Sequence, residues 1–138
     1  MTDVHSPAVR SFNMSRINGK NTKPEMLVRK YLFSKGFRYR LHVSNLPGKP
    51  DIVLPKYKTV IFINGCFWHG HEGCKYFVVP KTRTNEWMEK INKNTINDKR
   101  NFESLILDGW RPIIVWECEL HPKNIEATLL KLLKYFYE

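Results

Sequence analysis

Three cysteines and one histidine constrain this chain more than any other feature of its sequence. They fall in the pattern Cys66-x4-His71-x2-Cys74, with Cys118 at the predicted end of a later strand. Thiolate and imidazole groups in this number are typical of a tetrahedral Cys3His zinc site. Because four protein ligands leave no open position, such a Zn²⁺ would be structural. The alternative is three unrelated buried thiols, since free cysteine is often a small core residue.

The charge of the chain indicates a polyanionic partner. Its 138 residues include 23 Lys and Arg against 13 Asp and Glu, which gives a formal net charge of +10. Nucleic acid is the leading candidate for so small and basic a protein, although a basic surface can also serve solubility alone. Residues 1–21 are interpreted as a basic N-terminal arm, and a frayed terminus fits their composition equally well.

Length and hydropathy predict one domain, residues 1–138, without a membrane span. No apolar run approaches the roughly 18 residues that a spanning helix needs, and the first residues lack the apolar core of a signal peptide. An odd number of cysteines also argues against a disulfide framework. We therefore expect a monomeric, cytoplasmic protein.

Hydrophobic periodicity predicts the element order α-β-β-β-α-β-α. Helices are expected over 23–35, from Thr84 as N-cap to the residue before Asp108, and over 124–137. Strands are expected over 37–43, 51–54, 59–63 and 110–116. This order favours an α/β fold in which helices flank a mixed β-sheet.

Local signals set the ends and faces of these elements. Thr22 and Glu25 form a capping-box pattern before the first helix, and Gly36 suits its C-terminal end. The alternation in 37–43 places His42 on the solvent face of its strand. The spacing of apolar residues in the second helix puts Asp98 on its inward face.

One acidic residue suggests a catalytic metal site. Asp51 follows Pro50 at the start of a short strand, and the next strand ends at Ile63, a layout that resembles nucleases of the PD-(D/E)xK class. Asp51 would then bind Mg²⁺, which prefers one or two carboxylates with waters and phosphate oxygens. A Pro-Asp pair is also a common turn signal.

The second half of that nuclease motif is missing, because Phe62-Ile63-Asn64 supplies neither an acid nor a lysine. Another group must therefore activate water. His69 lies beside the zinc ligands but outside the predicted tetrahedron, and histidine titrates near neutrality. The alternatives are a further metal ligand or a surface histidine.

Several longer stretches form a recognisable set: residues 46–51 (LPGKPD), 60–71 (VIFINGCFWHGH), 80–84 (PKTRT) and 115–118 (VWEC). With 10–17 (RSFNMSRI) and 90–100, they closely resemble the very short patch repair (Vsr) endonucleases over about residues 3 to 120. The resemblance implies a restriction-endonuclease-like enzyme with structural Zn²⁺ and catalytic Mg²⁺. It implies nicking of one DNA strand on the 5′ side of the thymine in a T·G mismatch, the product of 5-methylcytosine deamination.

Matching positions carry the expected catalytic roles. Asp51 and the backbone carbonyl of Ile63 would hold Mg²⁺, and His69 would be the general base. Glu25 and Asp98 would support the site or a hydrated metal. Glu25 also fits a purely structural capping-box role.

The resemblance also implies how the protein engages double-stranded DNA. Phe67, Trp68 and Trp87 would wedge into the duplex from the major groove, and Met14 would enter from the minor groove. Wedging costs least where pairing is already poor, so it favours a mismatch. Core packing is the alternative for these three side chains, above all for Trp87 on its helix face. The remaining expected DNA contacts are Arg16, Lys20 and Asn94.

The chain departs from the family pattern at two places. Asn64 stands where the family commonly has a second catalytic histidine, and one residue is inserted in the knuckle between His69 and Cys74. Asn64 cannot take a proton but can hydrogen-bond a phosphate or a metal-bound water. We therefore expect reduced or altered activity. Mismatch-repair proteins are candidate partners in this reading.

Two other functions stay open at this point. One is a sequence-specific restriction or homing-type nuclease on the same scaffold, and the other is a non-catalytic zinc module that binds DNA.

Overall fold

A four-stranded sheet with the order β1-β2-β3-β4 lies at the centre of the protein. The computed structural model describes residues 22–75 and 77–137, so the predicted arm with Met14, Arg16 and Lys20 lies outside the described residues. β1 (Arg40–Leu41), β2 (Ile52–Leu54) and β3 (Thr59–Asn64) are antiparallel neighbours, whereas β3 and β4 (Arg111–Trp116) are parallel. The predicted mixed sheet is confirmed.

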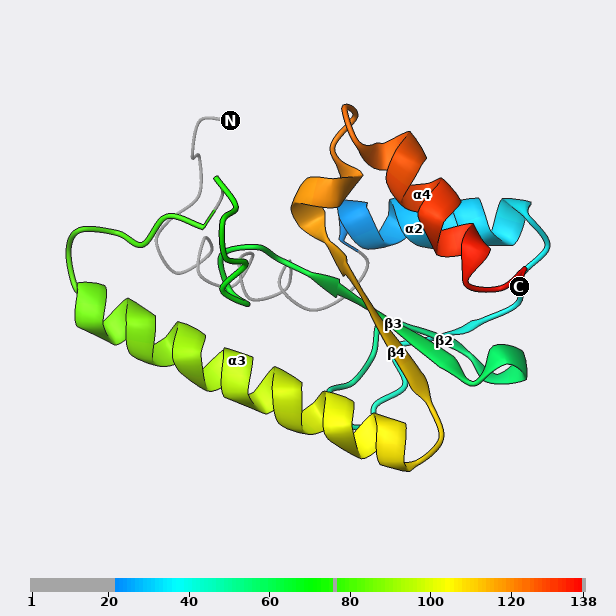
Figure 1. The fold of residues 1–138 in the computed structure, drawn as a ribbon, viewed down its shortest axis with the longest axis horizontal. Coiled ribbons are helices and arrows are strands. Elements are labelled where there is room, and N and C mark those ends of the chain that lie inside the picture. Colours follow the sequence, from blue (N-terminus) through cyan, green and yellow to red (C-terminus); the bar gives the residue numbers. More distant parts are fainter. Residues whose placement is uncertain (1–21, 76, 138) are drawn as a thin grey trace, which may run out of the picture.

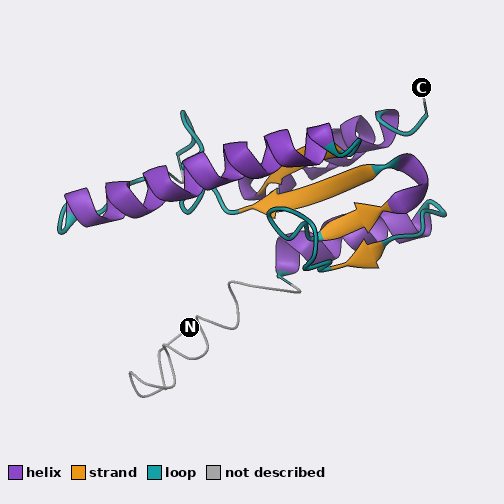
Figure 2. Cartoon of the chain, turned by 90° about the horizontal axis from the view of Figure 1, so that it is seen from below, coloured by secondary structure: helices purple, strands orange, loops and turns teal. Residues whose placement is uncertain are grey.

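Helices cover both faces of this sheet. α2 (Lys23–Ser34) and α4 (Ile125–Lys134) lie together on one face, and the long α3 (Thr84–Leu107) crosses the other (Figures 1 and 2). Two short 3-10 helices, Pro55–Tyr57 and Glu117–Leu120, follow β2 and β4. None of the described helices is both long and apolar enough to cross a membrane.

Each face of the sheet has its own apolar core. The core under α2 and α4 includes Val28, Leu32, Ile61 and Leu129, all 9 % exposed or less. The core under α3 is smaller and includes Val60, Phe62 and Leu105. β3 contributes to both, which agrees with the apolar run over residues 60–63 within it and with the expectation of a central strand.

The parallel pair β3 and β4 determines where the site can form. Parallel neighbours need a crossover connection, and α3 supplies it. The pair ends with Asn64 opposite Trp116. The loop after β3 and the 3-10 helix after β4 therefore begin side by side, at the C-terminal ends of the two strands. This brings Cys66 and Cys118 together despite their separation in sequence.

Three local predictions need correction. The predicted strand 37–43 pairs only at Arg40–Leu41, because His42 adopts a left-handed backbone conformation with φ 51° and ends it. His42 is therefore not on the solvent face, and its side chain is 16 % exposed. Arg83, rather than Thr84, is the N-cap of α3, and the Thr84 hydroxyl donates to the Pro80 carbonyl.

The first and last helices are closer to expectation. The Thr22 hydroxyl accepts from the Glu25 amide at 3.4 Å, as the N-cap signal predicts. Gly36 follows α2 with φ 90°, a conformation that favours glycine. The last helix ends at Lys134 rather than at residue 137.

Candidate active site and metal centre

The four predicted zinc ligands lie together beyond the C-terminal ends of β3 and β4. One ligand atom from each of Cys66, His71, Cys74 and Cys118 lies within 4.8 Å of all the others. The Cys118 sulfur is 3.5 Å from Nδ1 of His71. Tetrahedral zinc, with bonds of about 2.3 Å to sulfur and about 2.1 Å to nitrogen, places two such atoms about 3.6 Å apart. The residues therefore fit a tetrahedral divalent metal.

The electrostatics of the thiols fit the same interpretation. Burial raises the pKa of the Cys66 thiol. Burial, followed by the neighbouring Cys66 and Cys74 thiols, raises the pKa of Cys118 to about 12. A divalent cation among these groups would reverse the shifts, because thiolate is the ligating form.

Neighbouring groups hold the four-ligand Cys3His cluster in place. The His71 and Trp116 rings stack with centroids 4.0 Å apart and planes 4° from parallel. The His71 amide donates to the Cys66 carbonyl at 2.9 Å, which closes the turn that contains residues 67–70. The cluster therefore fixes both ends of this short segment.

The segment is also held against α3. Gly70 has φ +62°, and a Cβ at this position would lie 2.9 Å from Cγ2 of Ile91, so the close approach requires glycine. The Asn94 side chain donates to the Trp68 carbonyl at 2.9 Å. Asn94, predicted as a DNA contact, therefore also holds the loop in the DNA-free protein.

His69 and Asp98 form a pair across this loop and α3. Nδ1 of His69 lies 2.6 Å from Oδ2 of Asp98, and the two side chains are 28 % and 31 % exposed. Asp98 faces the loop, as the helix pattern predicts. An ionised carboxylate accepts Nδ1–H, which leaves Nε2 as the basic atom of the imidazole. This arrangement can remove a proton from a water molecule.

A second cluster lies at the start of β2. Atoms of Glu25, His42 and Asp51 all lie within 4.8 Å of one another. Oδ2 of Asp51 accepts from the Ile63 amide at 2.7 Å. Glu25, only 1 % exposed, has its Oε2 within 2.8 Å of His42 Nε2 and 2.9 Å of an Arg29 nitrogen. The Glu25 carboxylate thus points toward Asp51 and His42 rather than serving only the helix end.

The local environment strongly shifts the pKa of Asp51. Burial is the main reason that the pKa of Asp51 is raised to about 6, and the nearby Glu25 charge adds to the rise. The hydrogen bond from the Ile63 amide opposes it, as do the charges of His42 and His69. A divalent cation beside these two carboxylates would offset the effect of the Glu25 charge on Asp51, so the pair fits a divalent metal.

The predicted wedge residues form one aromatic cluster. The ring centroids of Phe67 and Trp68 are 5.2 Å apart, and Trp87 lies 5.5 Å and 5.8 Å from them. Trp68 is 37 % exposed. Trp87 therefore packs on the other two predicted wedges rather than in either sheet core.

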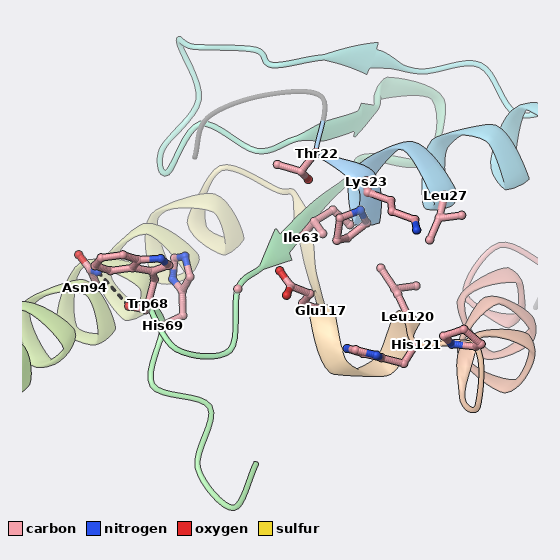
Figure 3. A pocket seen from close by; sticks show the side chains of 13 residues that line it. Thr22, Lys23, Leu27, Ile63, Trp68, His69, Asn94, Glu117, Leu120 and His121 are labelled. Atoms are coloured by element: carbon pink, nitrogen blue, oxygen red, sulfur yellow. Dashed lines mark hydrogen bonds between the residues drawn. The ribbon is translucent and has the colours of Figure 1, made fainter. Parts of the chain in front are cut away.

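A cleft of about 700 Å³ adjoins these groups. Figure 3 shows Trp68, His69 and Asn94 on one side of it, with Ile63 and the first turn of α2 on another. Asn64 lies beside Ile63 and is 5 % exposed. It stands between two residues that line the cleft, Ile63 and Gly65, but does not line the cleft itself.

Sequence reasoning missed two members of the site. His42 was expected to face solvent, and Arg29 carried no predicted role. Both bond to the buried Glu25 carboxylate. The spacing of Glu25 and Arg29 by four residues on a helix is a signal that could have identified the second.

The comparison with known proteins decides the family. A family model described as DNA mismatch endonuclease Vsr matches residues 2–75. The chain belongs to the Vsr endonuclease family. It is 47 % identical over 124 residues to the DNA mismatch endonuclease Vsr of Escherichia coli, covering 90 % of this chain and 79 % of that protein. It is thus a DNA endonuclease, which removes the non-catalytic alternative.

Other Vsr relatives are named as nicking enzymes. The chain is 54 % identical over 125 residues to the type II nicking enzyme V.NmeAIP of Neisseria meningitidis, covering 91 % of this chain and 89 % of that one. It is 46 % identical over 134 residues to V.XorIIP of Xanthomonas oryzae, covering 96 % and 98 %.

A solved structure supports the fold. The catalytic domain of the homing endonuclease I-Bth0305I superposes with a TM-score of 0.56 at 21 % identity, covering 85 % of this chain and 96 % of that chain. The Vsr chain therefore shares the fold of that catalytic domain.

Proposed function

We propose that this Vsr endonuclease nicks one strand of duplex DNA on the 5′ side of the thymine in a T·G mismatch, with Mg²⁺ as its catalytic metal. The observation that carries the proposal is the position of the aromatic cluster. Trp68 is directly followed by His69 on a loop whose ends are both fixed. Trp68, which is suited to wedging, and His69, which is suited to proton transfer, are therefore held together on one loop.

Asp51, Glu25 and the backbone carbonyl of Ile63 would hold Mg²⁺. The closeness of the two carboxylates supports this assignment, because Mg²⁺ is commonly bound through one or two of them. When bound, the ion would polarise the scissile phosphate and neutralise its developing charge. Sequence-independent attraction to the backbone phosphates comes from the net charge of +10.

The proton chemistry belongs to His69. With Nδ1 held by Asp98, Nε2 takes a proton from the attacking water. The buried Asn64 amide would orient a phosphate oxygen or a water but cannot replace a base. We therefore expect a slower reaction than in relatives with histidine at this position.

We propose Zn²⁺ as the ion of the Cys3His cluster, in a structural role. The four ligands leave no position for a substrate. The ion would clamp the segment between Cys66 and His71, and this segment contains Phe67, Trp68 and His69. We further propose a cytoplasmic monomer and mismatch-repair proteins as recruiting partners.

The named relatives favour a second candidate. Relatives called type II nicking enzymes fit the alternative of a sequence-specific nuclease that nicks one strand. On this reading the chain would nick a matched site of fixed sequence. Substrate design separates the two, since the mismatch proposal requires T·G whereas the matched-site proposal does not.

Single-turnover nicking with Mg²⁺ is the test. Two duplexes with identical flanks, one with T·G and one with C·G, are compared over a panel of flanking sequences. We expect nicking of the thymine strand at T·G at a rate at least about tenfold above C·G, because poor pairing lowers the cost of wedging. Equal rates on both duplexes for every cleaved flank would reject mismatch recognition in favour of a matched site.

A further inference from the structure

We propose that His42 is a positioning residue of the active site, which fixes the Glu25 carboxylate beside Asp51 and so preforms the binding site for a divalent cation. This inference rests on the proposed function only in assigning the cation to Asp51 and Glu25. It adds a residue that the Vsr resemblance did not assign.

His42 joins the Glu25 side chain on α2 to the backbone that precedes β2. Its imidazole Nε2 lies 2.8 Å from Oε2 of Glu25 on α2. Its backbone amide donates to the Asp51 carbonyl at 3.1 Å, immediately before β2. One residue therefore connects the helix that contains one carboxylate with the strand start that contains the other.

The backbone of His42 is bent for this contact. Its φ of 51° lies in the left-handed region, which residues other than glycine seldom adopt, although asparagine, aspartate and histidine do so more often than the rest. Continued alternation from Arg40 would have turned the imidazole toward solvent. The bend instead turns it inward, where the side chain is 16 % exposed. Strained backbone of this kind persists where the surrounding structure requires it.

The contact with His42 stabilises the buried Glu25 carboxylate. At 1 % exposure its charge is removed from water, and a buried charge is costly unless donors compensate for it. Arg29 bonds to the same oxygen from the next turn of α2. Because Arg29 lies on the helix of Glu25, it can fix the carboxylate relative to α2 but not relative to Asp51. His42 supplies that second constraint.

Positioning explains the geometry better than direct ligation of the metal. Nε2 is already committed to Glu25, and a metal on that atom would break the hydrogen bond. Mg²⁺ also takes oxygen ligands, whereas imidazole suits zinc, copper, iron or nickel. Residues that orient a ligand in this way typically change metal affinity by about 10–100-fold when they are removed.

Two substitutions of similar chemistry test the inference. In His42→Gln, the terminal amide nitrogen can take the place of Nε2 and bond to Glu25. In His42→Asn, the side chain is one methylene shorter and does not reach. Asparagine, however, tolerates the left-handed backbone better than glutamine. Backbone strain alone would therefore favour His42→Asn, and the positioning role favours His42→Gln.

Mn²⁺ binding in the absence of DNA is the readout, measured by electron paramagnetic resonance at pH 7.5 on the zinc-loaded full chain. We expect His42→Gln to bind Mn²⁺ within about threefold of wild type and His42→Asn at least about tenfold more weakly. Unaltered zinc content and circular dichroism verify the fold. Equal affinity of His42→Asn and wild type, or equally weak binding by both variants, would overturn the positioning role.

Electron spin echo modulation separates positioning from ligation. We expect the same nitrogen coupling to Mn²⁺ in wild type and His42→Gln. A coupling present in wild type and lost in His42→Gln would make His42 a ligand and overturn the inference. Failure of the proposed metal site gives a different result, because wild type and Asp51→Ala would then bind Mn²⁺ equally weakly.

Discussion

His69 and Asp98 lie 29 positions apart in the chain, yet Nδ1 of the imidazole and Oδ2 of the carboxylate are 2.6 Å apart. The bond crosses from the loop after β3 to α3. It determines which imidazole nitrogen can accept a proton, because Nδ1–H is committed to the carboxylate. The proposed catalysis by His69 therefore depends on a residue that need not touch the substrate.

Asp98→Asn should lower the single-turnover nicking rate by about 10²–10⁴-fold, since an amide can donate to Nδ1 and so leave the proton on Nε2. Asp108→Asn, at the exposed C-terminal end of the same helix, is the matched control and should nick like wild type. A wild-type rate in Asp98→Asn would contradict the proposed role of the pair.

Metal affinity should depend on pH through Asp51. The raised pKa of about 6 means that the carboxyl is largely protonated below pH 6, and protons compete with a metal for the same oxygens. Mn²⁺ affinity should therefore fall by about tenfold per unit as pH decreases below about 6, and level off above pH 7. Titrations between pH 5.5 and 7.5 check this. Affinity that does not change over the range would argue against Asp51 as a ligand.

The zinc content of the protein should depend on His71 but not on His121. Elemental analysis should find about one zinc per wild-type chain, and His71→Ala should lose it together with thermal stability, because structural zinc contributes on the order of 10 kcal/mol to folding. His121 lines the cleft outside the four-ligand cluster, so His121→Ala should keep its zinc. A folded, zinc-free wild-type protein would refute the structural role.

Trp68 should contribute to mismatch binding rather than to general DNA affinity. Base stacking on an aromatic ring is worth about 1–3 kcal/mol, so Trp68→Ala should weaken T·G binding by about 5–150-fold and matched binding much less. Phe33→Ala removes another exposed aromatic side chain, 57 % exposed on α2, and should change neither. Fluorescence anisotropy with both duplexes measures the difference. An equal loss on both duplexes would count against the wedge.

The sequence predicted the element order and the mixed sheet because the apolar periods change cleanly along the chain. The change from period four before Gly36 to period two after Phe37 separates α2 from the first strand region, and the apolar run 59–63 marks the central strand. Spacing also predicted that Asp98 faces inward. These signals are local, so they can be read without knowledge of tertiary contacts.

The contacts of His42 could not be predicted in the same way. A left-handed backbone at a histidine has no composition signal, and the period of two placed the side chain in solvent. Its partner Glu25 is 17 positions away, on another element. Arg83 is similar, because an arginine with φ 54° is an unusual N-cap, and the favoured cap residue Thr84 stands next to it. Tertiary packing determines the backbone conformation of both residues.

The proposed metal site is best tested by single-turnover nicking of a T·G duplex with Mg²⁺, using wild type and Asp51→Asn at equal zinc content. Asparagine keeps the shape of the side chain but removes the charge that binds the cation. We predict nicking by wild type on the 5′ side of the mismatched thymine and a rate at least about 10³-fold lower for Asp51→Asn. Equal nicking by the two proteins would contradict the metal site on which the proposed mechanism depends.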